Sequence, residues 1–313
     1  MTEVTDVTAI EPRPTGAVLE HLLRMLDLQP LGDDRFLGVP GVFELPRVFG
    51  GQVLAQGLMA AGRTLSTDGT PSAKTAHSLH GYFLRAGETG VDISYQVERV
   101  RDGRRLSTRS VTAIQHGRPI ATMLVSFAET EGELSHQVAA PDCPPIGTVP
   151  TLGEVAEQWG GLGDVWQGVE SLELRIDPRQ VMTSGTNELR PGEASDWTDH
   201  VWQRAPGPLP DEQLIHQALL TYASDVTILA SALVPYGVRI GQESVGGRTW
   251  DGVSIDHALW FHRPVRADDW MHFYQHSPSS ARGRALTQAQ VFDPAGTLLA
   301  SVAQEGLLIV EPG

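Results

Sequence analysis

The chain has 313 residues, of which 41% are hydrophobic and 19% charged, and its formal net charge is −15. This balance excludes an intrinsically disordered chain, and the length indicates two domains or one large one. Such an acidic chain is a poor partner for nucleic acid and for anionic membranes. The sequence contains no run of about 18 apolar residues, so we predict no membrane span. The N-terminus lacks the features of a signal peptide, and Cys143 is the single cysteine, so we expect a cytoplasmic protein without disulfides.

The first part of the chain predicts two helices and a set of antiparallel strands. Residues 17–28 have helical periodicity, a short strand is expected at 34–38, and a second helix at 48–65 begins just after two glycines. About four antiparallel strands follow, with hairpin turns at Asp102-Gly103 and His116-Gly117. We expect residues 17–130 to form an N-terminal domain.

The rest of the chain repeats this order after a change in composition. Residues 131–170 are rich in Pro and Gly and are expected to connect two domains. Residues 171–313 then predict strands at 171–177 and 200–206, a long helix at 211–233, and further strands with a turn at Asp293–Gly296.

The two halves can be overlaid, which indicates an internal duplication. Phe83 and Arg85 fall on Phe261 and Arg263. The predicted fold class is therefore α+β, with two tandem hotdog domains that each wrap a curved antiparallel sheet around a long helix. In this overlay, Gln304 falls near Val125 and Asp225 falls near Ala60.

Several common catalytic signatures are absent from the sequence. It has no GxSxG, no P-loop, no GxGxxG after a strand, no HExxH and no CxxC, which argues against a serine hydrolase or a dinucleotide enzyme. The neighbouring histidines His77/His80 and His257/His262 lack the even spacing that would place them on one face of a strand. We therefore predict no metal site.

Asp225 is the most unusual polar residue. An α-helix turns by about 100° per residue, and this rotation places Asp225 in the apolar stripe of its predicted helix. Either it is a local cap or tilts to solvent, or it is a carboxylate held in an apolar environment to act on a proton or a water. Ser254 and Gln304 also stand at apolar positions, and the overlaid N-terminal positions are apolar. We expect the half of the chain that carries these polar residues to contain the active site.

Six stretches carry a family resemblance over residues 17–310: VFGGQVLAQGLMAA, HSLHGYFLRAG, RDGRRLSTRSVTAIQHGRPI, HQALLTYASD, SIDHALWFHRP and ASVAQEG. In these stretches the chain resembles the acyl-CoA thioesterase II family. The resemblance implies hydrolysis of fatty acyl-CoA to free acid and CoA, no cofactor, and a homo-oligomer. It places the family's catalytic aspartate on Asp225, its glutamine on Gln304, and its hydroxyl residue, usually Thr, on Ser254.

The resulting hypothesis is a thioesterase that activates a water directly. Asp225 would be the general base, and Ser254 and Gln304 would orient the water or stabilise developing charge. A backbone N–H near Gly50 and Gly51 could stabilise the oxyanion. Cationic candidates for the CoA phosphates are Arg101, Arg104, Arg105, Arg109 and Arg263, although the arginine-rich strand could equally be a solvated face.

Two other functions are kept as alternatives. A hydratase-type hotdog enzyme would need an Asp/His pair, but Asp256 and His257 are neighbours in a strand and point to opposite faces. A non-catalytic acyl-CoA-binding or regulatory protein would have no need for Asp225 and Gln304.

Overall fold

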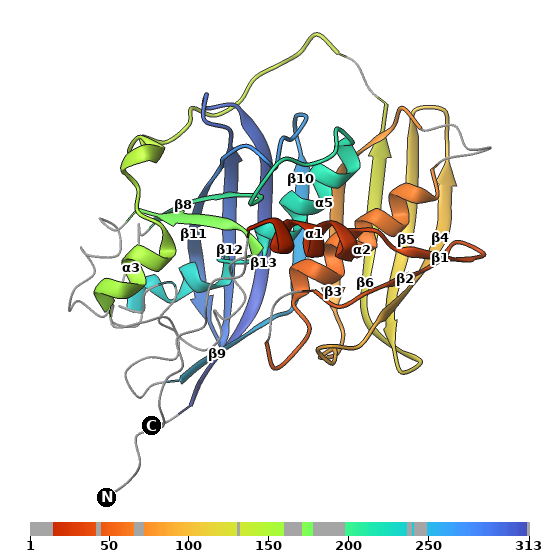
Figure 1. The fold of residues 1–313 in the computed structure, drawn as a ribbon, viewed down its shortest axis with the longest axis horizontal. Helices are drawn as coiled ribbons and strands as arrows, with labels where there is room; N and C mark the ends of the chain where they lie inside the picture. Colours follow the sequence, from red (N-terminus) through yellow and green to blue (C-terminus); the bar gives the residue numbers. More distant parts are fainter. Residues whose placement is uncertain are drawn as a thin grey trace, which may run out of the picture.

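The fold is one large antiparallel sheet with helices across one of its faces (Figure 1). The computed structural model describes residues 15–41, 45–65, 72–129, 132–159, 171–177, 198–236, 240 and 249–311. Within these residues the sheet has 13 strands. The N-terminal tail and most of the Gly-rich part of the predicted connection lie outside the described residues.

In its described residues, the N-terminal half has two helices and six strands. Its elements are α1 (Thr15–Leu26), β1 (Gln29–Gly32), β2 (Arg35–Gly38), α2 (Gly50–Arg63), β3 (Thr75–Phe83), β4 (Ile93–Asp102), β5 (Leu106–Gln115) and β6 (Arg118–Ala128). The hairpin turns that the sequence predicts after Asp102 and at His116-Gly117 are both present. His116 and Gly117 have φ angles of 49° and 71°, as a tight hairpin turn requires.

The C-terminal half repeats this order. Its repeated elements are β7 (Glu173–Ile176), β8 (Thr198–Arg204), α5 (Gln213–Ser224), β10 (Asp256–Phe261), β11 (Met271–Ala281), β12 (Arg284–Phe292) and β13 (Leu298–Glu311). The additional elements are η1 (Ile146–Thr148), α3 (Leu152–Trp159), η4 (Leu229–Ala232), η5 (Val234–Tyr236) and β9 (Thr249–Ser254). The predicted turn at Asp293–Gly296 is present, with a hydrogen bond from Gly296 N–H to Asp293 O.

The order of strands in the sheet is symmetric about its centre. It runs β1-β2-β4-β5-β6-β3-β10-β13-β12-β11-β8-β7, with β9 paired to β13. Strands β3 and β10 meet in the middle, so the two halves join edge to edge and neither leaves a free edge there. The predicted α+β architecture of two helix-and-sheet units is confirmed.

Equivalent hydrogen bonds establish the register between the halves. In the N-terminal half the backbone N–H of Arg85 donates to Ile120 O, and in the C-terminal half that of Arg263 donates to Leu299 O. The overlay of Arg85 on Arg263 is therefore confirmed, and Ile120 corresponds to Leu299.

The same register extends to the buried pairs along the central strands. Five residues beyond Ile120 and Leu299 lie Val125 and Gln304, as predicted. Leu79 pairs with Val125 in the N-terminal half, and His257 contacts Gln304 in the C-terminal half. An apolar pair in one half thus corresponds to a polar pair in the other.

The predicted long helix ends earlier than expected. It is α5, which stops at Ser224, and Asp225 is its C-cap residue. The C-cap of α2 is Thr64, so the central helices of the two halves end at Asp225 and at Thr64, and the overlay of Asp225 on Ala60 stays a prediction. The helical-phase argument placed Asp225 on a buried face for a helix that does not continue past it.

The stretch Gln213–Tyr236 is long and apolar enough to cross a membrane by composition alone, which the sequence reasoning overlooked. However, 83% of its most apolar window is buried inside the protein. It contains α5, which packs against α2 in the middle of the fold (Figure 1). We therefore assign this stretch to the core.

Candidate active site

The carboxylate of Asp225 lies where the two central helices meet. Asp225 ends α5 and is 9% exposed. It accepts a hydrogen bond from the backbone N–H of Gly51, in the first turn of α2. A Cβ on Gly50 would lie 2.6 Å from Asp225 Oδ2, so only glycine lets the start of α2 approach so closely. The positive end of the α2 dipole therefore faces the carboxylate.

Ser254 and Gln304 complete the contacts of Asp225. Ser254 is the last residue of β9, rather than the first residue of a strand as expected, and it pairs with Gly306 on β13. Gln304 is fully buried on β13, and its Nε2 donates to Ser254 Oγ over 2.9 Å. Both side chains also hydrogen-bond to Asp225. The three predicted catalytic residues thus meet at one carboxylate.

His257 is a fourth member of this cluster that the sequence reasoning did not assign to it. It is 1% exposed on β10, and its Nδ1 hydrogen-bonds to Gln304 Oε1. An amide oxygen only accepts, so Nδ1 carries the proton in this contact. Its Nε2 lies 2.9 Å from Ser224 Oγ. The contact with His257 therefore fixes the orientation of the Gln304 amide. It turns the Nε2 of Gln304 toward Ser254 and Asp225.

Burial controls the protonation of the cluster. It raises the pKa of Asp225, while hydrogen bonds from Gln304, Gly51 and Ser254, and the charge that His257 carries when it is protonated, act in the opposite direction. Burial also lowers the pKa of His257. We therefore treat His257 as neutral at pH 7, and Asp225 as a stronger base than an exposed carboxylate.

The cluster has an apolar neighbour in η4. A Cβ on Gly306 would lie 2.5 Å from a methyl carbon of Leu229, and one on Gly252 would lie 3.0 Å from the other. The side chain of Leu229 therefore packs directly over β9 and β13, next to the positions of Ser254 and Gln304. One side of the site is polar and the adjoining side is aliphatic.

The Asp/His pair considered for a hydratase is not arranged for that chemistry. Asp256 Oδ1 accepts the backbone N–H of Glu305 over 2.8 Å, which fixes it in the strand pairing. His257 instead faces Gln304, on the opposite side of β10.

Arg109 is not available to a ligand at the surface, contrary to expectation. Its side chain is 1% exposed. Its Nε donates to Thr64 Oγ1 and its Nη2 donates to Asp102 Oδ1, both over 2.7 Å. The guanidinium thus caps the C-terminal end of α2, where a cation is favoured by the helix dipole.

The other predicted cations are spread over two places. Arg101, Arg104 and Arg105 are exposed at the β4–β5 hairpin, which Arg109 and Asp102 join to the C-terminal end of α2. The 14 residues of α2 span about 21 Å, so this hairpin lies far from Asp225. Arg263 is half-buried and donates through Nη1 to Leu298 O over 2.8 Å. The structure therefore brings none of these arginines into the Asp225 cluster.

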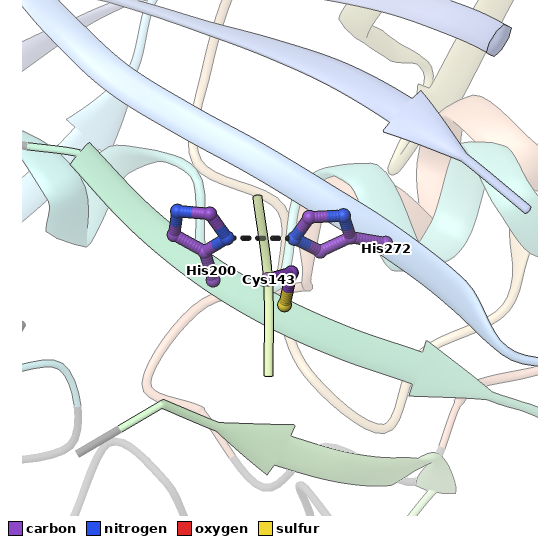
Figure 2. A group of neighbouring side chains, drawn as sticks. All are labelled: Cys143, His200 and His272. Atoms are coloured by element: carbon purple, nitrogen blue, oxygen red, sulfur yellow. Dashed lines mark hydrogen bonds between the residues drawn. The ribbon is translucent and has the colours of Figure 1, made fainter. Parts of the chain in front are cut away.

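A second polar cluster was missed from the sequence. Cys143, His200 and His272 lie together in Figure 2, and their donor atoms are all within 4.8 Å of one another. They are far apart in sequence, and the only histidine pairs considered were neighbours along single strands. Nothing short of the strand pairing of β8 with β11 could have revealed this group.

Comparisons with known protein families and curated proteins agree over both halves. A family model described as acyl-CoA thioesterase matches residues 173–307, and one described as acyl-CoA thioesterase N-terminal domain matches residues 41–128. Human acyl-coenzyme A thioesterase 8 is 33% identical over 92% of this chain and 88% of the relative. Acyl-CoA thioesterase 2 of Haemophilus influenzae is 32% identical over 93% of this chain and 98% of the relative.

Solved structures show the same architecture. An acyl-CoA thioesterase II, TesB2, from Mycobacterium marinum is 37% identical, with a TM-score of 0.72 over 93% of this chain and 99% of that one. A hot dog fold protein from Alicyclobacillus acidocaldarius is 18% identical, with a TM-score of 0.70 over 93% of this chain and 98% of that one.

Proposed function

Because the chain belongs to the acyl-CoA thioesterase family, we propose that its acyl-CoA substrate is hydrolysed by a water that Asp225, Ser254 and Gln304 activate, without a covalent intermediate. The observation that carries this proposal is the convergence of the Ser254 hydroxyl and the Gln304 amide on one buried carboxylate. A carboxylate with a raised pKa and a fixed orientation is suited to general base catalysis.

The proposed reaction has one chemical centre, the thioester carbonyl. Asp225 takes a proton from the water as the water oxygen bonds to the carbonyl carbon. The resulting tetrahedral intermediate collapses, the carbon–sulfur bond breaks, and the proton on Asp225 passes to the leaving thiolate. The products are the free acid and CoA, and Asp225 returns to its ionised form.

The start of α2 is the proposed site for the oxyanion. Gly51 N–H already donates to Asp225, which places the preceding Gly50 N–H beside the reacting centre. The first N–H groups of a helix have no partner within the helix and point along its positive dipole end. Without side chains at Gly50 and Gly51, Asp225 and the Tyr222 carbonyl approach the first turn of α2 closely.

Asp225 acts as a base here rather than as a nucleophile. Its oxygens accept from Gly51, Ser254 and Gln304, which spreads the carboxylate charge over three donors and holds it in place. Ser254 and Gln304 are then already oriented to hold a water next to Asp225. The aliphatic side chain of Leu229 beside them suits the first carbons of an acyl chain.

The proposal is tested by measuring thiol release from acyl-CoA substrates of increasing chain length. The unaltered chain should turn over at least one chain length, and Asp225→Asn should lower kcat by about 10³-fold or more. Asp211→Asn is the matched control, because Asp211 is 96% exposed and should retain full activity. Full turnover by a folded Asp225→Asn variant would contradict the assigned role.

We also propose that the chain forms a homo-oligomer through the outer face of its central strands. Tyr82 on β3, Leu124 on β6 and Trp260 on β10 are 59%, 53% and 37% exposed. They lie on neighbouring strands at the junction of the two halves. Light scattering should give a mass above that of one chain, and Trp260→Glu should lower it; a monomeric unaltered chain would refute the proposal.

A further inference from the structure

The outer face of the C-terminal sheet carries a cluster of soft and nitrogen donors unrelated to Asp225. His200 lies on β8 and His272 on β11, two strands that pair directly. His272 is opposite Trp202, so the two histidines are diagonal neighbours on one face. Gln203, on the other face of β8, hydrogen-bonds to Ala223 O of α5. The histidines therefore point away from the central helices.

The predicted connection between the halves supplies the third donor. Cys143 crosses this face of the sheet, between the two imidazoles in Figure 2. Trp202 Nε1 donates to Cys143 Sγ over 3.3 Å. The connection is also held to the β12–β13 turn, because Gln137 Nε2 donates to Gly296 O and Gln137 Oε1 accepts from Leu298 N–H. Cys143 and the segment before it are thus both attached to the C-terminal sheet.

We propose that Cys143, His200 and His272 form a zinc site that attaches the inter-domain connection to the C-terminal sheet. The three donor atoms lie within 4.8 Å of one another. Tetrahedral zinc with Zn–S and Zn–N bonds of usual length separates its ligand atoms by roughly 3.3–3.6 Å. His200 Nδ1 and His272 Nε2 are 3.0 Å apart, so small rotations of the two rings open the required space.

The type of donor favours zinc over hard cations. One thiolate and two imidazoles suit zinc, whereas magnesium and calcium prefer oxygen ligands. When zinc binds, Cys143 loses its thiol proton to solvent. His200 coordinates the zinc through Nδ1 and His272 through Nε2, the two nitrogens that face each other in the structure. The Trp202 N–H bond to Sγ is the kind of outer contact that stabilises a coordinated thiolate.

The surroundings also fit an ion that enters from solvent. His200 and His272 are 5% and 3% exposed, while Cys143 is partly exposed. An ion can therefore reach the donors from the Cys143 side and retain a water as fourth ligand. Because the site lies on the face of β8 opposite α5, its metal is not part of the hydrolytic chemistry.

The test uses the full chain, treated with a chelator and then titrated with zinc or cobalt. We expect one zinc per chain and a Tm rise of roughly 3–6 °C at saturating zinc, with kcat unchanged. Cobalt should give the thiolate-to-metal charge-transfer absorption and the strong visible bands of four-coordinate cobalt. Cys143→Ser should abolish the charge-transfer absorption and weaken zinc binding by about 100-fold or more.

Two further variants keep the test decisive. His272→Gln should weaken zinc binding as Cys143→Ser does, and its folding is checked by thioesterase turnover. His80→Gln is the control, because His80 is exposed on β3 and should leave zinc binding unchanged. Less than half an equivalent of bound zinc, or equal affinity in the unaltered chain and in Cys143→Ser, would overturn the proposal.

Discussion

The two halves share one fold but differ at one corner, where the central helix ends against the innermost strands. The C-terminal half carries a polar set there, and the N-terminal half carries a mostly apolar set at the corresponding positions. The corresponding strand residues are Ser254 and Ala76, His257 and Leu79, and Gln304 and Val125, and the central helices end at Asp225 and at Thr64.

The two halves place opposite charges at the C-terminal end of the central helix, which is the negative end of the helix dipole. In the N-terminal half Arg109 caps α2, and a cation at a helix C-terminus is stabilising. In the C-terminal half the C-cap is Asp225, an anion that its own helix dipole disfavours. The start of α2 from the other half offsets this cost by donating Gly51 N–H. The site therefore depends on both halves, although its polar side chains come from one.

The largest effect after the loss of Asp225 is expected from converting Gln304 to the residue of the N-terminal half. Gln304→Val removes the amide that contacts Ser254 and Asp225, and kcat should fall by about 10²–10³-fold. It also leaves the buried Nδ1–H of His257 without a partner, which should cost about 1–3 kcal/mol of stability.

The double variant Gln304→Val/His257→Leu reproduces the Leu79–Val125 pair. It should be more stable than Gln304→Val alone in urea unfolding, because no buried donor is left unpaired, yet it should remain inactive. Equal or lower stability of the double variant would show that the two corners are not interchangeable in packing.

His257→Leu alone tests whether the imidazole positions the Gln304 amide. Without a donor to Oε1 the amide can turn over, so kcat should fall by about 10–100-fold while KM changes little. His257→Asn keeps a side-chain N–H near the position of Nδ1 and should recover part of kcat. If His257→Leu and His257→Asn are equally impaired, the histidine has only a packing role.

A smaller effect is expected at Ser254. Ser254→Ala, which copies Ala76, should lower kcat by about tenfold, because Asp225 and Gln304 keep their direct contact. Ser254→Thr keeps the hydroxyl and should retain most of the activity. Steady-state kinetics of both variants separate loss of the hydroxyl from a change in side-chain volume, and an inactive Ser254→Thr would argue against the hydroxyl role.

The smallest effect concerns CoA recognition by the β4–β5 hairpin. If Arg104 and Arg105 hold the CoA phosphates, reversing both charges should raise KM about threefold at low salt and leave kcat unchanged. Arg282→Glu, in the turn between β11 and β12 of the other half, is the control. An unchanged KM would assign the hairpin to a solvated surface.

The sequence predicted the fold and the central residues because both depend on local patterns. The family resemblance is confirmed, and the repeated order of elements was visible from strand alternation and turns. Gln304 was recognisable because an amide in an apolar strand requires partners. Asp225 was recognised for a partly wrong reason, since its burial comes from the start of α2 and not from the phase of a continuous helix.

The missed features depend on contacts between distant segments. His257 was judged against its strand neighbour Asp256, whereas its partners lie across the sheet on β13 and at the end of α5. Arg109 looked like one of several surface arginines until the pairing of β5 with its neighbours placed it against Thr64. Strand β9 was not predicted, because its pairing with the far end of β13 leaves no periodic signal.

The most direct test of the account is the pH dependence of kcat/KM, measured together with circular dichroism to confirm folding at each pH. The ionised form of Asp225 is the proposed base, and burial raises the pKa of this group from its ordinary value of 3.8. Activity should therefore fall with decreasing pH along a single acid limb whose midpoint lies above 3.8, and the residual activity of Asp225→Asn should lack that limb. A folded, unaltered chain whose kcat/KM shows no acid limb, or an Asp225→Asn variant that keeps it, would contradict general base catalysis by Asp225.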